Sequence, residues 1–188
     1  MINAMRLWKL GHVLLRVSDE ERARWFYCDV LGLKVAERDP DHGGLFTTLG
    51  DGFHTLDFAK HPAGEQAQKP SRDQLGLIHI AFQVENYADL RDAYTNLLRN
   101  GVAIDHATDH ENQRSLYFRD PDGNGLEIYY EFPCARQIFP NGRHDIDTAL
   151  EVGGPDDPLP AWLQETWPGP ELQARIDALR EPAAGVAS

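Results

Sequence analysis

Three polar residues lie in short apolar runs typical of buried β-strands, and their types are those that bind transition metals. They are His12, His79 and Glu127. A carboxylate is costly to bury unless it is paired or binds a metal. Taken singly, each has an ordinary explanation, because a strand histidine is often a hydrogen-bonded core residue and a strand glutamate often faces water. Together, two imidazoles and one carboxylate can hold iron(II) on one side and leave its other positions open.

An internal repeat places the two histidines in equivalent positions. The segment LGHVLLRV at 10–17 resembles LIHIAFQV at 77–84, with His12 and His79 in register. Two copies related by a pseudo-two-fold axis would bring these histidines together. Glu127 is expected on the last strand of the second copy, antiparallel to its first strand and facing the same hollow.

Helix signals follow each of the two leading strands. Ser18 to Glu21 form a capping-box pattern, and Gly32 ends the helix that it begins. Asn86 begins the second helix, which ends at Asn100-Gly101. Three further strands follow each helix, at about 33–38, 44–49, 53–59, 102–107, 114–119 and 126–131.

The expected fold class is therefore α+β, with two tandem βαβββ modules. The modules cover about 8–60 and 76–131 and should form a curved mixed sheet around a metal site. We expect residues 1–131 to form one domain. Residues 132–188 interrupt the pattern with Pro, Gly and two tryptophans, and we expect them to be a C-terminal extension that packs on the domain.

Composition excludes several classes of function. The 188 residues carry a formal net charge of −12, which opposes binding to nucleic acid or anionic lipid. No apolar run reaches the roughly 20 residues of a membrane-spanning helix, and the first residues lack a signal-peptide pattern. The two cysteines make no disulfide framework. A cytoplasmic protein that forms a homo-oligomer is expected, with no nucleic-acid or membrane partner.

Beyond these residues, the chain resembles the vicinal-oxygen-chelate superfamily, which has the glyoxalase/bleomycin-resistance/extradiol dioxygenase fold. The resemblance covers about 8–131 and is carried by GHV at 11–13, IHIAF at 78–82 and SLYFRDPDGNGLEIY at 115–129. Within the superfamily it is similar to small, one-domain type I extradiol catechol dioxygenases. The last motif occurs throughout the superfamily, so it indicates the fold strongly and the reaction weakly.

Three more residues favour the dioxygenases within this resemblance. FHTLDF at 53–58 resembles the segment in which a histidine, here His54, is the acid–base catalyst. Tyr117 takes the place of a tyrosine near the bound substrate, and His110 that of a histidine that contacts substrate. Asp57 stands where isomerases of the superfamily have a fourth metal ligand. Strict strand alternation would send His54 and Asp57 to opposite faces, and we expect Asp57 to be a neighbour of the metal.

The resemblance implies a reaction and a cofactor. Fe(II), or Mn(II) in its place, would be held by His12, His79 and Glu127, and the partners would be a catechol-type substrate and dioxygen. His54 and Tyr117 would be catalytic, and His110 would orient the substrate during extradiol cleavage to a muconic semialdehyde type product. Two alternatives remain on the same fold: a metal-dependent isomerase, epimerase or thiol transferase, and a non-catalytic binding protein.

Overall fold

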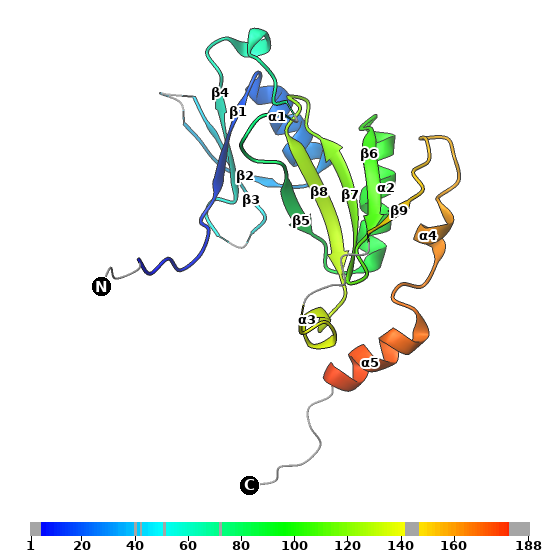
Figure 1. The fold of residues 1–188 in the computed structure, drawn as a ribbon. Helices are drawn as coiled ribbons and strands as arrows, with labels where there is room; N and C mark the ends of the chain where they lie inside the picture. Colours follow the sequence, from blue (N-terminus) through cyan, green and yellow to red (C-terminus); the bar gives the residue numbers. More distant parts are fainter. Residues whose placement is uncertain are drawn as a thin grey trace. The chain divides into compact units, whose positions relative to one another are not determined.

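The computed structural model describes residues 5–39, 41, 43–50, 52–71, 73–141 and 147–180. The chain divides into two compact units. Unit 1 comprises Met1–Ser71 with Asp120–Gly123, and unit 2 comprises Arg72–Arg119 with Asn124–Ser188. Each unit contains one mixed sheet with its helices, so the α+β fold of two βαβββ repeats is confirmed (Figure 1). The boundary between a domain over 1–131 and an extension over 132–188 stays a prediction.

Unit 1 contains a four-stranded sheet in the order β1-β4-β3-β2. Strand β1 pairs with β4 in parallel, and the other neighbours are antiparallel. Helix α1 continues without a break into a π-helical segment, η1, and their apolar side chains cover the core strands. The elements in chain order are β1 (Val13–Val17), α1 (Glu20–Arg24), η1 (Trp25–Val30), β2 (Lys34–Arg38), β3 (Leu45–Thr48), β4 (Leu56–Lys60) and a 3-10 turn, η2 (Gly64–Gln66).

The start of α1 differs from the expected capping box by one residue. Asp19 is the N-cap, and its side chain accepts a hydrogen bond from the backbone N–H of Arg22 at 2.8 Å. Ser18 instead donates its backbone N–H to Asp122 Oδ2 at 3.0 Å. In the same loop, Asp120 Oδ2 accepts a hydrogen bond from the hydroxyl of Tyr27 at 2.8 Å. The aspartates of the superfamily-wide motif therefore tie its loop to the first helix, which is a structural role.

Unit 2 contains a five-stranded sheet in the order β5-β8-β7-β6-β9. Strand β8, which carries Glu127, runs parallel to β5, so the antiparallel arrangement expected from the sequence was wrong. The reason is topological, because α2 returns the chain before β6 and two hairpins then bring β8 back to the direction of β5. The elements are β5 (Ile80–Gln83), α2 (Tyr87–Arg99), β6 (Ile104–Asp109), β7 (Gln113–Arg119), β8 (Gly125–Glu131), α3 (Ala135–Ile138), β9 (Thr148–Leu150), α4 (Ala161–Gln164) and α5 (Pro170–Arg180).

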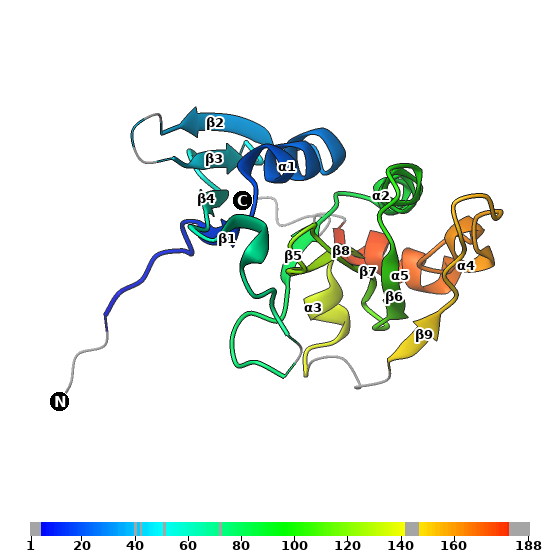
Figure 2. The same ribbon diagram turned by 90° about the horizontal axis from the view of Figure 1, so that it is seen from above.

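Helix α2 has the boundaries that its sequence signals indicate. The side chain of Asn86 accepts from the backbone N–H of Asp89 at 3.0 Å, and Gly101 takes a left-handed φ of 72° after the last turn. Leu90, Tyr94 and Leu97 are buried, and α2 contacts β8 from one side of the sheet, where Figure 2 shows the helix nearly end-on. The apolar stripe of this helix therefore contributes to the core of unit 2.

The start of β5 leaves no room for a side chain on the neighbouring strand. A Cβ atom on Gly125 would lie 2.2 Å from the carbonyl oxygen of Ile78. Only glycine lets the backbone of β8 approach so closely, and this approach sets the position of His79, the next residue after Ile78.

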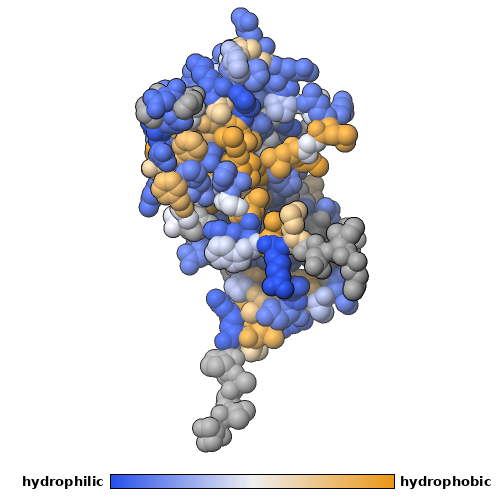
Figure 3. Space-filling model, turned by 90° about the vertical axis from the view of Figure 1, so that its left-hand side faces the viewer, coloured by the Kyte–Doolittle hydropathy of each residue, from blue (hydrophilic) through white to orange (hydrophobic). Residues whose placement is uncertain are grey.

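The surface of the described chain is mixed. Hydrophilic side chains predominate on the face that Figure 3 shows, with apolar side chains in patches between them. Exposed large apolar residues include Leu7, Trp8, Leu75 and Ile78. Among the described residues, no helix has both the length and the apolar character required to span a bilayer.

Residues after β8 pack within unit 2 around one arginine. Arg114, on β7, is buried, and its guanidinium lies 4.9 Å from the centre of the Trp167 ring. It donates to the carbonyl oxygen of Trp162 at 3.0 Å and to Asp109 Oδ2 at 2.9 Å. Strand β9 also adds to the edge of the sheet by pairing with β6. The segment after β8 thus contributes aromatic side chains to the core of unit 2.

Replacing Arg114 by Ala should lower the free energy of unfolding by roughly 3–5 kcal/mol, because it removes the guanidinium that bonds Asp109 Oδ2 and the buried Tyr87 hydroxyl and that packs on Trp167. Urea denaturation followed by tryptophan fluorescence measures the change. Arg175→Ala, on the exposed face of α5, is the control and should change stability by less than about 0.5 kcal/mol. A loss below about 1 kcal/mol for Arg114→Ala would contradict the role of this arginine.

Candidate functional site

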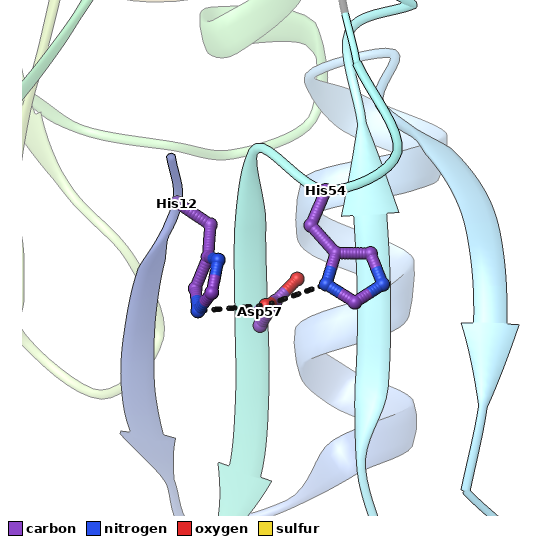
Figure 4. A group of neighbouring side chains, drawn as sticks. All are labelled: His12, His54 and Asp57. Atoms are coloured by element: carbon purple, nitrogen blue, oxygen red, sulfur yellow. Dashed lines mark ion pairs between the residues drawn. The ribbon is translucent and has the colours of Figure 1, made fainter. Parts of the chain in front are cut away.

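Unit 1 brings together three of the candidate residues (Figure 4). His12 immediately precedes β1, Asp57 is the second residue of β4, and His54 lies in the turn before β4. The Oδ2 atom of Asp57 lies 3.7 Å from His12 Nε2 and 3.3 Å from His54 Nδ1. One ligand atom from each residue lies within 4.8 Å of the others, a spacing that a single metal ion can bridge.

The sequence argument that separated His54 from Asp57 was wrong. Side chains alternate between faces only within a strand, and β4 begins at Leu56, two residues after His54. His54 is therefore free of the alternation, and Figure 4 shows its ring turned toward the Asp57 carboxylate. No bulge within β4 is needed to bring the two side chains together.

Two phenylalanine rings hold the imidazole of His54. Phe46 stacks on it with a centroid distance of 4.8 Å, and Phe53 stacks with a distance of 4.6 Å. Its Nδ1 faces Asp57, while its buried Nε2 has no hydrogen-bond partner among the residues that the structure describes and lies 3.9 Å from Glu37 Oε2. A histidine with one nitrogen beside a carboxylate and the other unbonded is suited to exchange a proton at the second nitrogen.

Unit 2 brings together the other candidates. His79 immediately precedes β5, and its Nε2 lies 3.0 Å from Glu127 Oε2 on β8. Tyr117, directly across from Glu127 on β7, donates its hydroxyl to Glu127 Oε1 at 2.9 Å. Gln113 lies within 3.5 Å of the same oxygen. Glu127 is only 4% exposed, so these polar neighbours are what make its burial tolerable.

The histidine and the carboxylate have the same strand register in the two units. Asp57 pairs with Leu14, two residues after His12, and Glu127 pairs with Ala81, two residues after His79. Each unit therefore presents one histidine and one carboxylate at equivalent places in its sheet.

The environment of Tyr117 keeps its hydroxyl protonated. Burial raises the pKa of Tyr117 to about 12, and the negative charge of Glu127 acts in the same direction. The hydroxyl is therefore a hydrogen-bond donor throughout the neutral range. His106, which was not singled out from the sequence, stacks on the Tyr117 ring with a centroid distance of 4.4 Å.

His110 lies in the turn between β6 and β7, next to Tyr117. Its Nε2 is 2.9 Å from the Tyr117 hydroxyl, and its Nδ1 is 2.6 Å from Asp147 Oδ1. Asp147 was missed by sequence reasoning, because it follows 37 residues later in a segment without a motif. The structural feature that brings Asp147 to His110 is the pairing of residues 148–150 with β6. A strand of three residues is too short to be recognised from the sequence, so this pairing could not be predicted.

The donor types fit a divalent transition metal. Neutral imidazoles and carboxylates are the ligands that iron(II), manganese(II) and zinc(II) accept in proteins. Asp57 is 1% exposed, and its Oδ1 has no hydrogen-bond partner among the described residues. An unbonded carboxylate oxygen at this depth is expensive, and a cation beside it would remove that cost.

Comparison with known proteins defines the class of this chain. A family model described as the Glyoxalase/Bleomycin resistance protein/Dioxygenase superfamily matches residues 9–128. The chain belongs to this superfamily. The resemblance inferred from the motifs is therefore confirmed.

Individual relatives within the superfamily differ in their reactions. Catechol-2,3-dioxygenase of Bacillus subtilis is 33% identical over 77% of this chain, which spans only 52% of that protein. Biphenyl-2,3-diol 1,2-dioxygenase 2 of Rhodococcus globerulus is 29% identical, covering 85% of this chain and 92% of the relative. Glutathione transferase FosA of Serratia marcescens is 31% identical over 69% of this chain and 86% of its own length.

Solved structures agree with the fold. A glyoxylase/bleomycin resistance protein/dioxygenase domain from Frankia sp. EAN1pec has a TM-score of 0.60 at 26% identity, covering 68% of this chain and 94% of that domain. Relatives thus include extradiol dioxygenases and thiol transferases, and the reaction must be argued from the residues of this chain.

Proposed function

We propose that this chain is an Fe(II)-dependent extradiol dioxygenase that opens a catecholic ring with dioxygen to give a muconic semialdehyde type product. The observation that carries the proposal is the connected set His79, Glu127, Tyr117 and His110 in unit 2. It places the Tyr117 hydroxyl directly beside Glu127, one of the proposed metal ligands, and His110 next to Tyr117. Ring cleavage needs such groups beside the metal, because both catechol oxygens must be oriented there.

The proposed ligands are His12, His79 and Glu127, with Mn(II) possible in place of Fe(II). When bound, the metal supplies a positive charge that favours loss of a catechol proton and a centre through which ring electrons reach dioxygen. Three protein ligands leave positions for the substrate oxygens and for dioxygen.

His54 is the proposed acid–base residue. Its unbonded Nε2 would accept the proton of a catechol hydroxyl and return it when the O–O bond breaks. Asp57 Oδ2, 3.3 Å from Nδ1, would favour the tautomer with its proton on Nδ1 and so leave the Nε2 lone pair available, which is the relation of histidine to carboxylate in catalytic triads. Phe46 and Phe53 keep the ring in this orientation.

Tyr117 and His110 are proposed to orient the substrate. The Tyr117 hydroxyl is protonated at neutral pH and would donate to a substrate oxygen beside Glu127. His110, held at Nδ1 by Asp147, would present Nε2 to the second catechol oxygen in place of the Tyr117 hydroxyl. Both oxygen atoms of dioxygen enter the product, so no external reductant is needed.

Oxygen uptake with catechols tests the proposal. Protein loaded anaerobically with Fe(II) should, on admission of air, consume about one dioxygen per catechol or biphenyl-2,3-diol and form a yellow product. An oxygen electrode and visible absorbance follow the two quantities together. Metal-free protein is the control. Loaded protein that consumes no oxygen with any catechol of a panel would overturn the proposal.

A second candidate function is a metal-dependent isomerase, epimerase or thiol transferase. The specific observation in its favour is Asp57, which is fully buried at the register position equivalent to Glu127 and has an unbonded oxygen. A four-ligand set of two histidines and two carboxylates would leave fewer open positions. Turnover of a hemithioacetal or an epoxide with thiol under anaerobic conditions, without oxygen uptake on catechols, would favour this function.

A further inference from the structure

The segment after β8 places a carboxylate against the substrate-orienting histidine. Asp147 immediately precedes β9, and its Oδ1 lies 2.6 Å from His110 Nδ1. The ring of His110 is buried, whereas the Asp147 side chain is about half exposed. The short distance and the buried ring distinguish this contact from an ordinary surface ion pair.

Strand pairing explains how Asp147 reaches this position. Strands β6 and β9 are antiparallel, with Asp109 opposite Thr148. Continuing the register by one residue on each strand places His110 opposite Asp147. Two further pairs hold β9 in this register, so the pairing of β6 with β9 brings the residues that flank these strands close together.

The contact with Asp147 determines which nitrogen of the His110 ring faces Tyr117. A carboxylate only accepts hydrogen bonds, so Nδ1 of His110 must carry a proton. The ring then presents Nε2 to the Tyr117 hydroxyl at 2.9 Å. The single proton of that hydroxyl can be donated either to Nε2 or to Glu127 Oε1, so the state of the His110 ring bears on the partner that Tyr117 takes. Without Asp147, Nδ1 loses the acceptor that favours a proton on it, so the ring could change tautomer.

We propose that Asp147 is a positioning residue that acts on the reaction through His110. It stabilises the Nδ1–H tautomer of His110 and the ring orientation in which Nε2 points toward Tyr117 and Glu127. The inference rests on the proposed function for its effect on catalysis, while the effect on the His110 ring is independent of it. The segment after β8 thereby supplies part of the active site in addition to core side chains.

The first test uses the full-length, metal-free protein. Long-range ¹H–¹⁵N NMR should show His110 of the wild type with its proton on Nδ1, and Asp147→Ala should shift the ring toward the Nε2–H form. Asp156→Ala, an exposed aspartate of the same unit, is the matched control and should leave the His110 signals unchanged. An unchanged His110 tautomer in Asp147→Ala overturns the inference.

The second test uses the Fe(II)-loaded protein and a catechol that the wild type cleaves. Asp147→Asn should lower kcat by about tenfold to a hundredfold, the usual cost of losing such an outer hydrogen-bond partner, with little change in KM. In a His110→Phe background, the same change should have no further effect, because Asp147 acts through His110. An additional loss in the double variant, or a wild-type kcat in Asp147→Asn, contradicts the inference.

The two tests separate this inference from the proposed function. If the wild type is inactive on every catechol but Asp147→Ala still shifts the His110 tautomer, the proposed function and the effect of Asp147 on catalysis are overturned. The claim that Asp147 positions the His110 ring then still stands. An active wild type with no tautomer shift overturns the role of Asp147 alone. Circular dichroism should show the same melting curve for Asp147→Asn and the wild type, because the side chain is half exposed.

Discussion

Glu127→Gln should abolish metal binding and turnover while the fold remains. Glutamine has the shape of glutamate and can still bond Tyr117 and Gln113, but it removes the anionic ligand. Affinity for iron should fall by more than about a hundredfold, since even the loss of an outer partner costs 10–100-fold. Metal content after anaerobic loading and gel filtration, measured by plasma emission, should drop from about one iron per chain to near zero.

Asp57→Asn is the matched comparison, because it makes the same chemical change at the equivalent register position. If the ligands are His12, His79 and Glu127, this variant should retain its iron. Loss of iron in Asp57→Asn together with retention in Glu127→Gln would move the metal to the cluster of His12, His54 and Asp57. Loss in both variants would indicate the four-ligand site of the second candidate function.

His54→Gln should retain iron and bind catechol but turn over about 10²–10⁴-fold more slowly, the usual range for general acid–base help. Glutamine can occupy the space between Phe46 and Phe53 but cannot shuttle a proton at neutral pH. The decrease should fall on kcat, because the proton transfers follow substrate binding. Steady-state kinetics by oxygen electrode give both constants.

His61→Gln is the control for this change, since His61 lies in the turn after β4 and its Nδ1 accepts a hydrogen bond from the backbone N–H of Ala63. It should leave kcat unchanged. A wild-type kcat in His54→Gln would show that another residue moves the proton, and His110 would be the next candidate.

The sequence by itself determined the features that depend on neighbours along the chain. The repeat, the strand segments and the cap at Asn86 follow from periodicity and local hydrogen bonding, which a short window of sequence contains. The equivalence of His12 with His79 follows from the repeat. The limit of local signals is already visible at the first helix, where Ser18 and Asp19 are both capping residues by type and only the contact of Ser18 with Asp122 decides between them.

Only the tertiary structure decided the contacts between residues far apart in sequence. The direction of β8, the approach of His54 to Asp57 and the contact of His110 with Asp147 depend on where strands begin and which strand pairs with which. A shift of one residue in register would move each side chain to the other face of its sheet. Register is fixed by the packing of the whole unit, so no local pattern in the sequence contains it.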